Sequence, residues 1–247
     1  MVILYEIILW SQSTLRNTSL TTGLAVSGQP KLYKQIWKAI AEGIKEDIIS
    51  GYYRPGDRLV EAELAAKYDS SKTPVKEALR YLNGIGFVEV VPYKGAIVTK
   101  MDKNDVISLY KIQSVLEALA AREALPNLGK ADYDKMETYA GLLENYYREG
   151  KKDKYEKANL MFHSVVWGGL DNRNLIDLII TIREKLQRYR PITRRYPEKF
   201  KELVAEHRKM IHVLKEKDVN RAEKMVRRHY EKNAEIIVSI LEREDGF

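Results

Sequence analysis

The sequence contains no cysteine and only four histidines in 247 residues. Without cysteine the chain can form no disulfide, iron–sulfur cluster or thiolate metal site, so any metal must bind nitrogen and oxygen ligands. Long hydrophobic runs are also missing. The opening MVILYEIILW is interrupted by Glu6, is too short to span a bilayer, and lacks the basic start and cleavage site of a signal peptide. We therefore expect a cytoplasmic protein that does not associate with membranes.

The chain is basic, with 42 lysines and arginines against 35 acidic residues and a net charge of +7. This excess favours a polyanionic partner, but the two signs are interspersed, as in many solvated helical proteins. The length suffices for two domains. Residues 1–30 are largely rich in Ser, Thr and Gly and aperiodic, so we expect a disordered or loosely attached leader.

From residue 31 to 100 the pattern predicts a winged helix-turn-helix. An apolar stripe at Ile36, Ile40, Ile44 and Ile48 predicts a helix that ends at GYYRPGD. Two shorter helices follow, over VEAELAAKY and TPVKEALRYLNGIG, and Ser71 or Thr73 is positioned to cap the second. The runs FVEVVPY and AIVTK then predict a hairpin with Gly95 at its tip.

Residues 101–247 predict only helices. The expected spans are 103–125, 131–148, 152–168, 173–190, 197–216 and 219–243, separated by breaks such as REGKKDK and RPITRRYP. Asp171 or Asn172 is expected to cap the fourth helix and Asp218 the last. Short connections between helices indicate an antiparallel bundle. The predicted fold is mainly α: a winged helix-turn-helix followed by an all-α bundle.

The segment SSKTPVKEALRYL has the features of a helix that reads DNA in the major groove. Lys72 and Lys76 share an exposed face, Ser71 and Thr73 can contact phosphate, and the opposite face is apolar. Lys94 places a positive charge in the wing. The alternative is a small helical subdomain with surface lysines.

The run from GYYRPGDRL through SSKTPVKEAL to VPYKGAIV closely resembles the DNA-binding domain of GntR-family bacterial transcription regulators. The chain departs from that family at Ala62, Lys72 and Lys76, where the family often has arginine. Lysine does not bind guanine bidentately as arginine does, so the family's operator sequences cannot be carried over. The residues expected to contact DNA are Lys72, Thr73, Lys76 and Lys94, with Ser71, Arg54, Arg80 and Gly95 as further candidates.

Three histidines, His163, His207 and His229, lie on three different predicted helices and can converge in a bundle core. Asn159 lies four residues before His163 and so shares its face. His212 is five residues beyond His207 and should point elsewhere. Imidazoles suit zinc, nickel, copper or iron, although isolated histidines are more often surface or core residues without a metal.

The pattern NLMFH, DNRNL, EHRKMI and AEKMVRRH resembles the FCD domain, the helical effector domain of FadR-type GntR regulators. The resemblance implies a divalent metal, zinc or nickel, held by Asn159, His163, His207 and His229 at the floor of an effector pocket. The family usually has aspartate in place of Asn159, and a neutral carbonyl binds a cation less strongly. Gln113 stands where the family often has an arginine facing the ligand.

An arginine cluster runs through the predicted fourth helix and the loop after it: Arg183, Arg188, Arg190, Arg194 and Arg195. One interpretation is a solvated helix end, and the other is attraction of an anionic effector or DNA. Arg183 is the expected pocket member.

Together these patterns indicate a homodimeric transcription factor, not an enzyme, that binds a pseudo-palindromic duplex operator. A small carboxylate effector at the metal-containing pocket would control its affinity for DNA. Two alternatives stay open: a regulator whose metal is structural or absent, and a metal-dependent hydrolase or lyase. The second lacks a general base at recognisable spacing, because Glu206 and the adjacent His207 should point about 100° apart on a helix.

Overall fold

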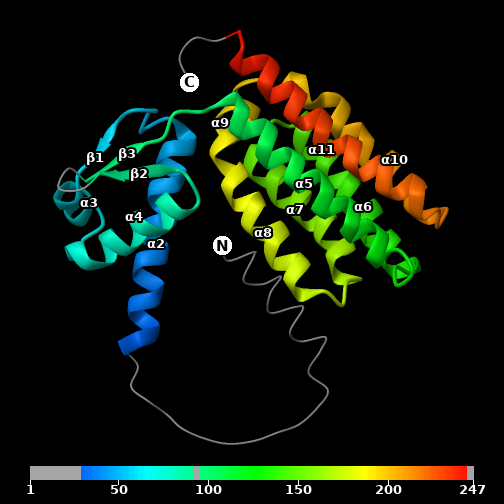
Figure 1. Cartoon of the computed structure of the whole chain (residues 1–247), viewed down its shortest axis with the longest axis horizontal. Helices are drawn as coiled ribbons and strands as arrows, with labels where there is room; N and C mark the ends of the chain where they lie inside the picture. The colour runs from blue at the N-terminus through cyan, green and yellow to red at the C-terminus, as the bar shows by residue number, and fades with distance from the viewer. Residues whose placement is uncertain (1–28, 92–94, 244–247) are drawn as a thin grey trace, which may run out of the picture. The chain divides into compact units, whose positions relative to one another are not determined.

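The computed structural model describes residues 29–91 and 95–243, with side chains from residue 36 onward (Figure 1). The chain folds into two compact units, and along the sequence the boundary between them falls between Met101 and Asp102. Most of the expected leader and the tip of the wing, including Lys94, lie outside the described residues. The two units are described separately below.

The first unit is a winged helix-turn-helix, as predicted. Helix α2 (Gln29–Ser50) precedes β1 (Arg58–Leu59), α3 (Glu61–Lys67) and α4 (Lys72–Gly84). Strands β2 (Val88–Val91) and β3 (Gly95–Val98) complete a three-stranded antiparallel sheet in the order β1-β3-β2. Strand β1 was not predicted from the sequence. GYYRPGD indicates only a turn, and the two residues of β1 that follow it are too few to show a strand pattern.

The core of this unit follows from the helical spacing of apolar residues. Ile40, Ile44 and Ile48 are buried as predicted, whereas Ile36, the first residue of the predicted stripe, is 38% exposed. The buried face of α4 packs against α2 and the sheet through the predicted residues Val75, Ala78, Leu79 and Leu82. Burial of the apolar side of α4 turns its polar side, which carries Lys72 and Lys76, toward solvent.

Gly95 is not at the hairpin tip, contrary to the prediction. It is the first residue of β3 and pairs with Val91. Its φ of +87° lies in the left-handed region, and a Cβ built on it would lie 2.6 Å from the carbonyl oxygen of Leu59. Glycine is required here because β1 approaches its backbone closely.

The second unit is the predicted helical bundle. Its long helices are α5 (Lys103–Ala124), α6 (Lys130–Arg148), α7 (Lys152–Gly168), α8 (Arg173–Leu186), α10 (Lys201–Lys215) and α11 (Val219–Leu241). Shorter elements lie between α8 and α10: η1 (Gln187–Tyr189), α9 (Arg190–Arg195) and η2 (Pro197–Phe200). The segment RPITRRYP, expected to be a break, therefore includes a short helix. Pro191 is tolerated in the first turn of α9, where its missing N–H needs no partner, and Ile192 is buried.

Capping side chains begin several of these helices. Asn172 accepts a hydrogen bond from the backbone N–H of Leu175, and Asp218 accepts one from Arg221, as predicted. Asp102 caps α5 in the same way. The prediction for α4 was wrong, because Ser71 occupies the cap position but its side chain makes no capping hydrogen bond.

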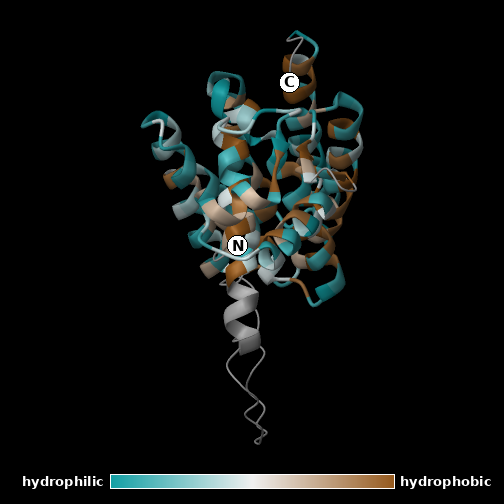
Figure 2. Ribbon diagram, turned by 90° about the vertical axis from the view of Figure 1, so that its left-hand side faces the viewer, coloured by the Kyte–Doolittle hydropathy of each residue, from teal (hydrophilic) through white to brown (hydrophobic). Residues whose placement is uncertain are grey.

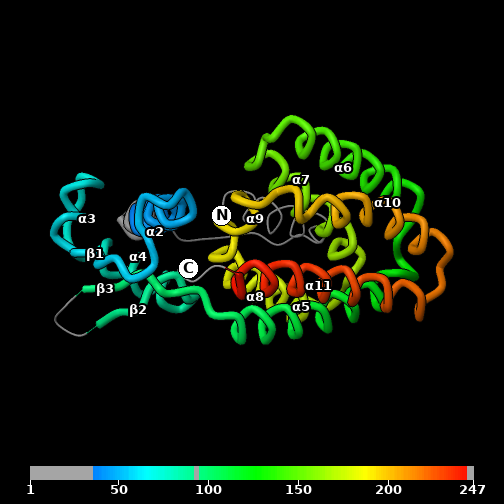
Figure 3. The backbone as a smooth tube through the Cα atoms, turned by 90° about the horizontal axis from the view of Figure 1, so that it is seen from above, coloured from blue at the N-terminus to red at the C-terminus, as the bar shows by residue number. Residues whose placement is uncertain are grey.

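Helix α11 packs along α5, and α8 packs on the same helix (Figures 1 and 3). Helix α6 packs against α7 and α10, which completes the bundle. The helices carry alternating hydrophilic and hydrophobic bands along their length (Figure 2), as expected for amphipathic helices around a shared core. None of the helices within the described residues is both long and apolar enough to cross a membrane.

Candidate functional site

Three of the four histidines meet in the interior of the bundle. His163 lies on α7, His207 on α10 and His229 on α11, and their residues are 3%, 1% and 3% exposed. One ring nitrogen from each lies within 4.8 Å of the others, and no other such group occurs among the described residues. The fourth histidine, His212, is exposed and pairs with Glu216. The convergence and the exclusion of His212 agree with the sequence prediction.

The contacts of His207 fit a ring with a nitrogen lone pair directed at Asn159. Nδ1 of His207 lies 3.2 Å from the carbonyl oxygen of Val204, which can only accept, and a proton on Nδ1 satisfies this contact. In the neutral ring Nε2 then presents a lone pair, and it lies 3.0 Å from Oδ1 of Asn159. Two acceptor atoms at this separation match two ligands of one ion, since atoms about 2.1 Å from a metal at a right angle lie about 3.0 Å apart.

Burial keeps His163 and His207 in the neutral form that binds metals. Burial, with the positive charge of Arg183 and the two neighbouring histidines, holds the pKa of His163 well below its usual value. Burial and proximity to His229 lower the pKa of His207 to about 3. Near neutral pH both rings are therefore unprotonated and their lone pairs are available. The donor set of imidazole nitrogens and one amide oxygen fits a divalent transition metal.

Glu206 on α10 has a partner that the sequence did not indicate. The expectation that it points away from His207 concerned only its neighbour in the chain. Its carboxylate instead accepts a hydrogen bond from Nδ1 of His229 on α11, over 3.0 Å. Burial would raise the pKa of Glu206, but hydrogen bonds from His229 and Lys232 outweigh it and hold the pKa at about 2.

A second polar cluster surrounds Glu117, a buried residue of α5. Its carboxylate accepts hydrogen bonds from Gln113 Nε2 (2.6 Å), Tyr230 Oη (2.9 Å), Trp167 Nε1 (2.9 Å) and Arg183 Nη1 (3.5 Å). Gln113 and Arg183, predicted from the sequence as effector-binding residues, are thus brought together. Glu117, Tyr230 and Trp167 were not predicted, although a carboxylate four residues after Gln113 on the buried face of α5 was an available signal.

This Glu117 cluster adjoins the histidines. The rings of Tyr230 and His163 have centroids 5.5 Å apart, and Arg183 is close enough to His163 to lower its pKa. Oε1 of Gln113 is buried and has no hydrogen-bond partner. Unpaired buried acceptors are rare in folded proteins, and this one is available to a ligand that donates a hydrogen bond.

Three of the other four arginines of the predicted cluster form ion pairs within the unit, and the fourth, Arg195, is exposed. Arg188 pairs with Asp105, and Arg190 and Arg194 both pair with Glu156. All three side chains are largely buried, so the solvated-end interpretation does not describe them. These ion pairs join η1 to α5 and α9 to α7.

Four of the predicted DNA-contacting residues of the first unit lie together at the start of α4. Ser71, Lys72, Thr73 and Lys76 are exposed at the start of α4. Lys76 Nζ lies 3.8 Å from a carboxylate oxygen of Glu61 on α3, a weak exposed pair.

Arg80, Arg54 and Gly95, the other described candidates, lie outside the start of α4, and Gly95 is the first residue of β3. Arg80 is exposed later on α4, where it pairs with Glu77. Arg54 is exposed in the turn between α2 and β1.

Two family models match the chain, one for each unit. Residues 37–98 match the model of bacterial regulatory proteins of the gntR family, and residues 108–232 match the FCD domain. The chain belongs to the GntR family, with an FCD C-terminal domain. The family consists of transcriptional regulators, which confirms that the chain is not an enzyme and removes the hydrolase or lyase alternative.

Individual relatives agree with this assignment. The chain is 25% identical to the HTH-type transcriptional regulator YdhC of Bacillus subtilis over 200 residues, covering 81% of this chain and 89% of YdhC. It is 28% identical over 139 residues to the Nta operon transcriptional regulator of Aminobacter aminovorans, covering 56% and 66% of the two chains. The structure of Escherichia coli McbR shares the fold with a TM-score of 0.70 at 20% identity, covering 83% of this chain and 98% of McbR.

Proposed function

We propose that this regulator binds a pseudo-palindromic operator as a homodimer and that a small carboxylate effector controls its affinity for DNA. The effector would bind at a metal-containing pocket in the helical bundle. In this proposal residues 31–100 form the DNA-binding domain and residues 101–247 the effector-binding and dimerisation domain. The observation that carries it is the buried convergence of His163, His207 and His229.

The metal would be held by these three histidines, with Asn159 as a fourth, weaker ligand. Zinc or nickel suits this donor set. When bound, such an ion supplies positive charge and open coordination positions for a carboxylate. Asn159 contributes no negative charge, so the four ligands leave the charge of the ion uncompensated, and an anionic effector can balance it.

The arrangement around Glu117 supports the metal as the main anchor for the effector carboxylate. Arg183 is close enough to His163 to lower its pKa, but Glu117 and the hydroxyl of Tyr230 already engage Arg183. Its charge is therefore largely balanced within the protein. Arg183 and Gln113 would instead orient the part of the effector that extends away from the ion.

For DNA binding we propose that the first turn of α4 enters the major groove. Lys72, Thr73 and Lys76 would reach base edges and phosphates, while Ser71, Arg54 and Arg80 contact the backbone. The wing, with Lys94 and the adjacent Gly95, would lie along the backbone or minor groove. All of these residues that lie within the described part of the chain, apart from Gly95, are exposed.

An apolar surface on the bundle supports the homodimer. Ile107, Ile112, Val115 and Leu119 of α5 and Leu178 of α8 are exposed large hydrophobic side chains. Because α8 packs on α5, their exposed sides belong to one pair of neighbouring helices. A two-fold interface would bury this surface against the same surface of a second copy. Sedimentation equilibrium of Val115→Asp should show a weaker dimer than the wild-type protein.

The metal can be tested with the fourth histidine as a matched control. We expect the purified protein to contain about one zinc or nickel per chain by elemental analysis, and a chelator to lower its melting temperature. His163→Ala should lose the metal, whereas His212→Ala, at an exposed position, should keep it. Failure of the wild-type protein to bind either ion would leave a DNA-binding regulator with no metal-linked effector site.

The effector can then be sought with the metal present. Small carboxylates would be screened by thermal shift, and those that stabilise the protein would be tested in gel shifts with duplexes recovered by in vitro selection. Stabilisation that persists unchanged after chelation, or in His163→Ala, would contradict an effector anchored by the metal.

A further inference from the structure

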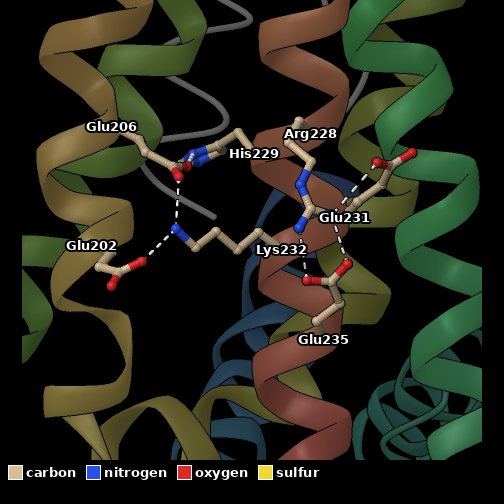
Figure 4. Close-up of polar contacts among 7 residues, drawn as sticks. All are labelled: Glu202, Glu206, Arg228, His229, Glu231, Lys232 and Glu235. Carbon is tan, nitrogen blue, oxygen red and sulfur yellow. Dashed lines mark hydrogen bonds and ion pairs between the residues drawn. The ribbon is translucent and has the colours of Figure 1, made fainter.

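The side chain of His229 is hydrogen-bonded to a carboxylate, and among the described residues no such bond is formed by the other two histidines of the cluster. Glu206 Oε2 lies 3.0 Å from Nδ1 of His229, and Glu206 Oε1 lies 3.0 Å from Nζ of Lys232 (Figure 4). Lys232 is one turn beyond His229 on α11, so it and His229 reach the same carboxylate on α10. In contrast, Nδ1 of His207 faces a neutral backbone carbonyl.

This contact determines which nitrogen of His229 carries the proton. An ionised carboxylate can only accept hydrogen bonds, so Nδ1 must donate. In the neutral ring Nε2 then holds the lone pair. A hydrogen bond to a carboxylate also makes the opposite nitrogen a better electron donor to a metal.

We propose that Glu206 is a positioning residue, held in place by Lys232, that orients His229 for metal binding and strengthens the bond from its Nε2. This inference rests on the metal site proposed above. Glu206 would not touch the ion, since it is outside the group of ligand atoms that lie within 4.8 Å of one another. Its effect would pass entirely through the imidazole ring.

The role of Lys232 follows from the burial of the carboxylate. The Glu206 side chain is 14% exposed, and an ionised carboxylate in such a place needs a compensating charge. Lys232 supplies it and is itself anchored by Glu202, whose carboxylate lies 2.6 Å from the same Nζ. Glu202 is one helical turn before Glu206 and its side chain is 77% exposed. Glu202 therefore offers a matched control: an acidic residue that shares the lysine without touching the histidine.

The test measures metal affinity directly, on the full-length protein stripped of metal. Zn²⁺ would be titrated in competition with a chromophoric chelator, and Co²⁺ would report the ligand field through its visible absorption. We expect Glu206→Ala to bind Zn²⁺ about 10- to 100-fold more weakly, as is typical when the hydrogen-bond partner of a metal-bound histidine is removed. Glu206→Gln keeps an acceptor oxygen, so its Zn²⁺ affinity should fall less. The Zn²⁺ affinity of Glu202→Gln should stay within about twofold of the wild type. The Co²⁺ absorption of Glu206→Ala should shift, because one imidazole is no longer oriented.

Several outcomes would overturn the inference. Zn²⁺ affinity of Glu206→Ala within about twofold of the wild type would show that His229 needs no positioning. If Glu202→Gln and Glu206→Ala lose Zn²⁺ affinity equally, the loss comes from the changed net charge near Lys232 and not from the hydrogen bond to His229. If Glu206→Ala does not fold, Glu206→Gln decides: wild-type affinity together with an unchanged Co²⁺ spectrum would refute a role for the charged partner. Absence of metal binding by the wild-type protein would remove the metal site as well, whereas the other outcomes leave it intact.

Discussion

Replacing Glu117 by glutamine should strongly destabilise the helical unit. Glu117 is buried and its two oxygens accept hydrogen bonds from four donors on α5, α7, α8 and α11. Glutamine fills the same space but replaces one accepting oxygen with an NH2 group. Whichever way the amide turns, its NH2 group faces at least one of these hydrogen-bond donors, which then has no acceptor. Arg183 also loses its only buried carboxylate partner among the described contacts.

The expected cost follows from these two losses. A buried donor left without a partner costs about 1–3 kcal/mol. Removal of one member of a buried ion pair costs about 3–5 kcal/mol. The Arg183 side chain is 19% exposed, so water partly solvates its charge and lowers this cost. We expect a total loss of about 3–4 kcal/mol in unfolding free energy, equivalent to a fall in melting temperature of roughly 6–16 °C for a unit of this size.

The assay must report the helical unit alone, because a chain of two units need not unfold in one step. The protein has three tryptophans, Trp10, Trp37 and Trp167, and only Trp167 lies in this unit. Urea unfolding followed by tryptophan emission in a Trp10→Phe, Trp37→Phe background therefore isolates it. Glu123→Gln, an exposed position on the same helix, should change stability by less than about 0.5 kcal/mol.

A double variant separates the charge from the hydrogen bonds. Adding Arg183→Met to Glu117→Gln removes the unpaired cation and should recover part of the lost stability. A loss below about 1 kcal/mol for Glu117→Gln alone would refute the argument, since it is smaller than the cost of one unpaired buried donor. No recovery in the double variant would show that the ion pair contributes nothing.

Three further predictions concern DNA binding, the winged unit and the pH dependence of stability. Lys72→Ala should weaken operator binding by roughly 1–3 kcal/mol in gel shifts at constant salt, and unchanged affinity would exclude a base contact. Gly95→Ala should destabilise the winged unit, measured by the unfolding of Trp37, because its Cβ would lie 2.6 Å from the Leu59 oxygen; wild-type stability would contradict this. The metal-free protein should lose stability below pH 6.5, since the folded pKa of His207 is about 3 while the unfolded chain takes up a proton near 6.5. Between pH 7 and pH 5 this loss is about 2 kcal/mol for His207, and a flat urea midpoint over that range would refute it.

Much of the fold could be predicted because helices and turns depend on nearby residues. The spacing of Ile40, Ile44 and Ile48, and the capping residues Asn172 and Asp218, each act within one or two turns. The errors arose where a contact from a distant element decided the outcome. Gly95 was placed at a tip because the pattern does not show that β1 lies against it. RPITRRYP was interpreted as a break because its proline and charges do not reveal that Ile192 is buried.

The candidate site divides in the same way. The sequence by itself determined which residues are the candidates, namely the histidines and the lysines at the start of α4, and it excluded any thiolate ligand. Only the tertiary structure decided that His163, His207 and His229 meet. It also decided that Glu206 accepts a hydrogen bond from His229. In the same way, only packing pairs Glu117 with Arg183. The physical reason is that helical periodicity orients a side chain about its own axis, whereas the packing of α5, α7, α8, α10 and α11 determines which side chains it meets.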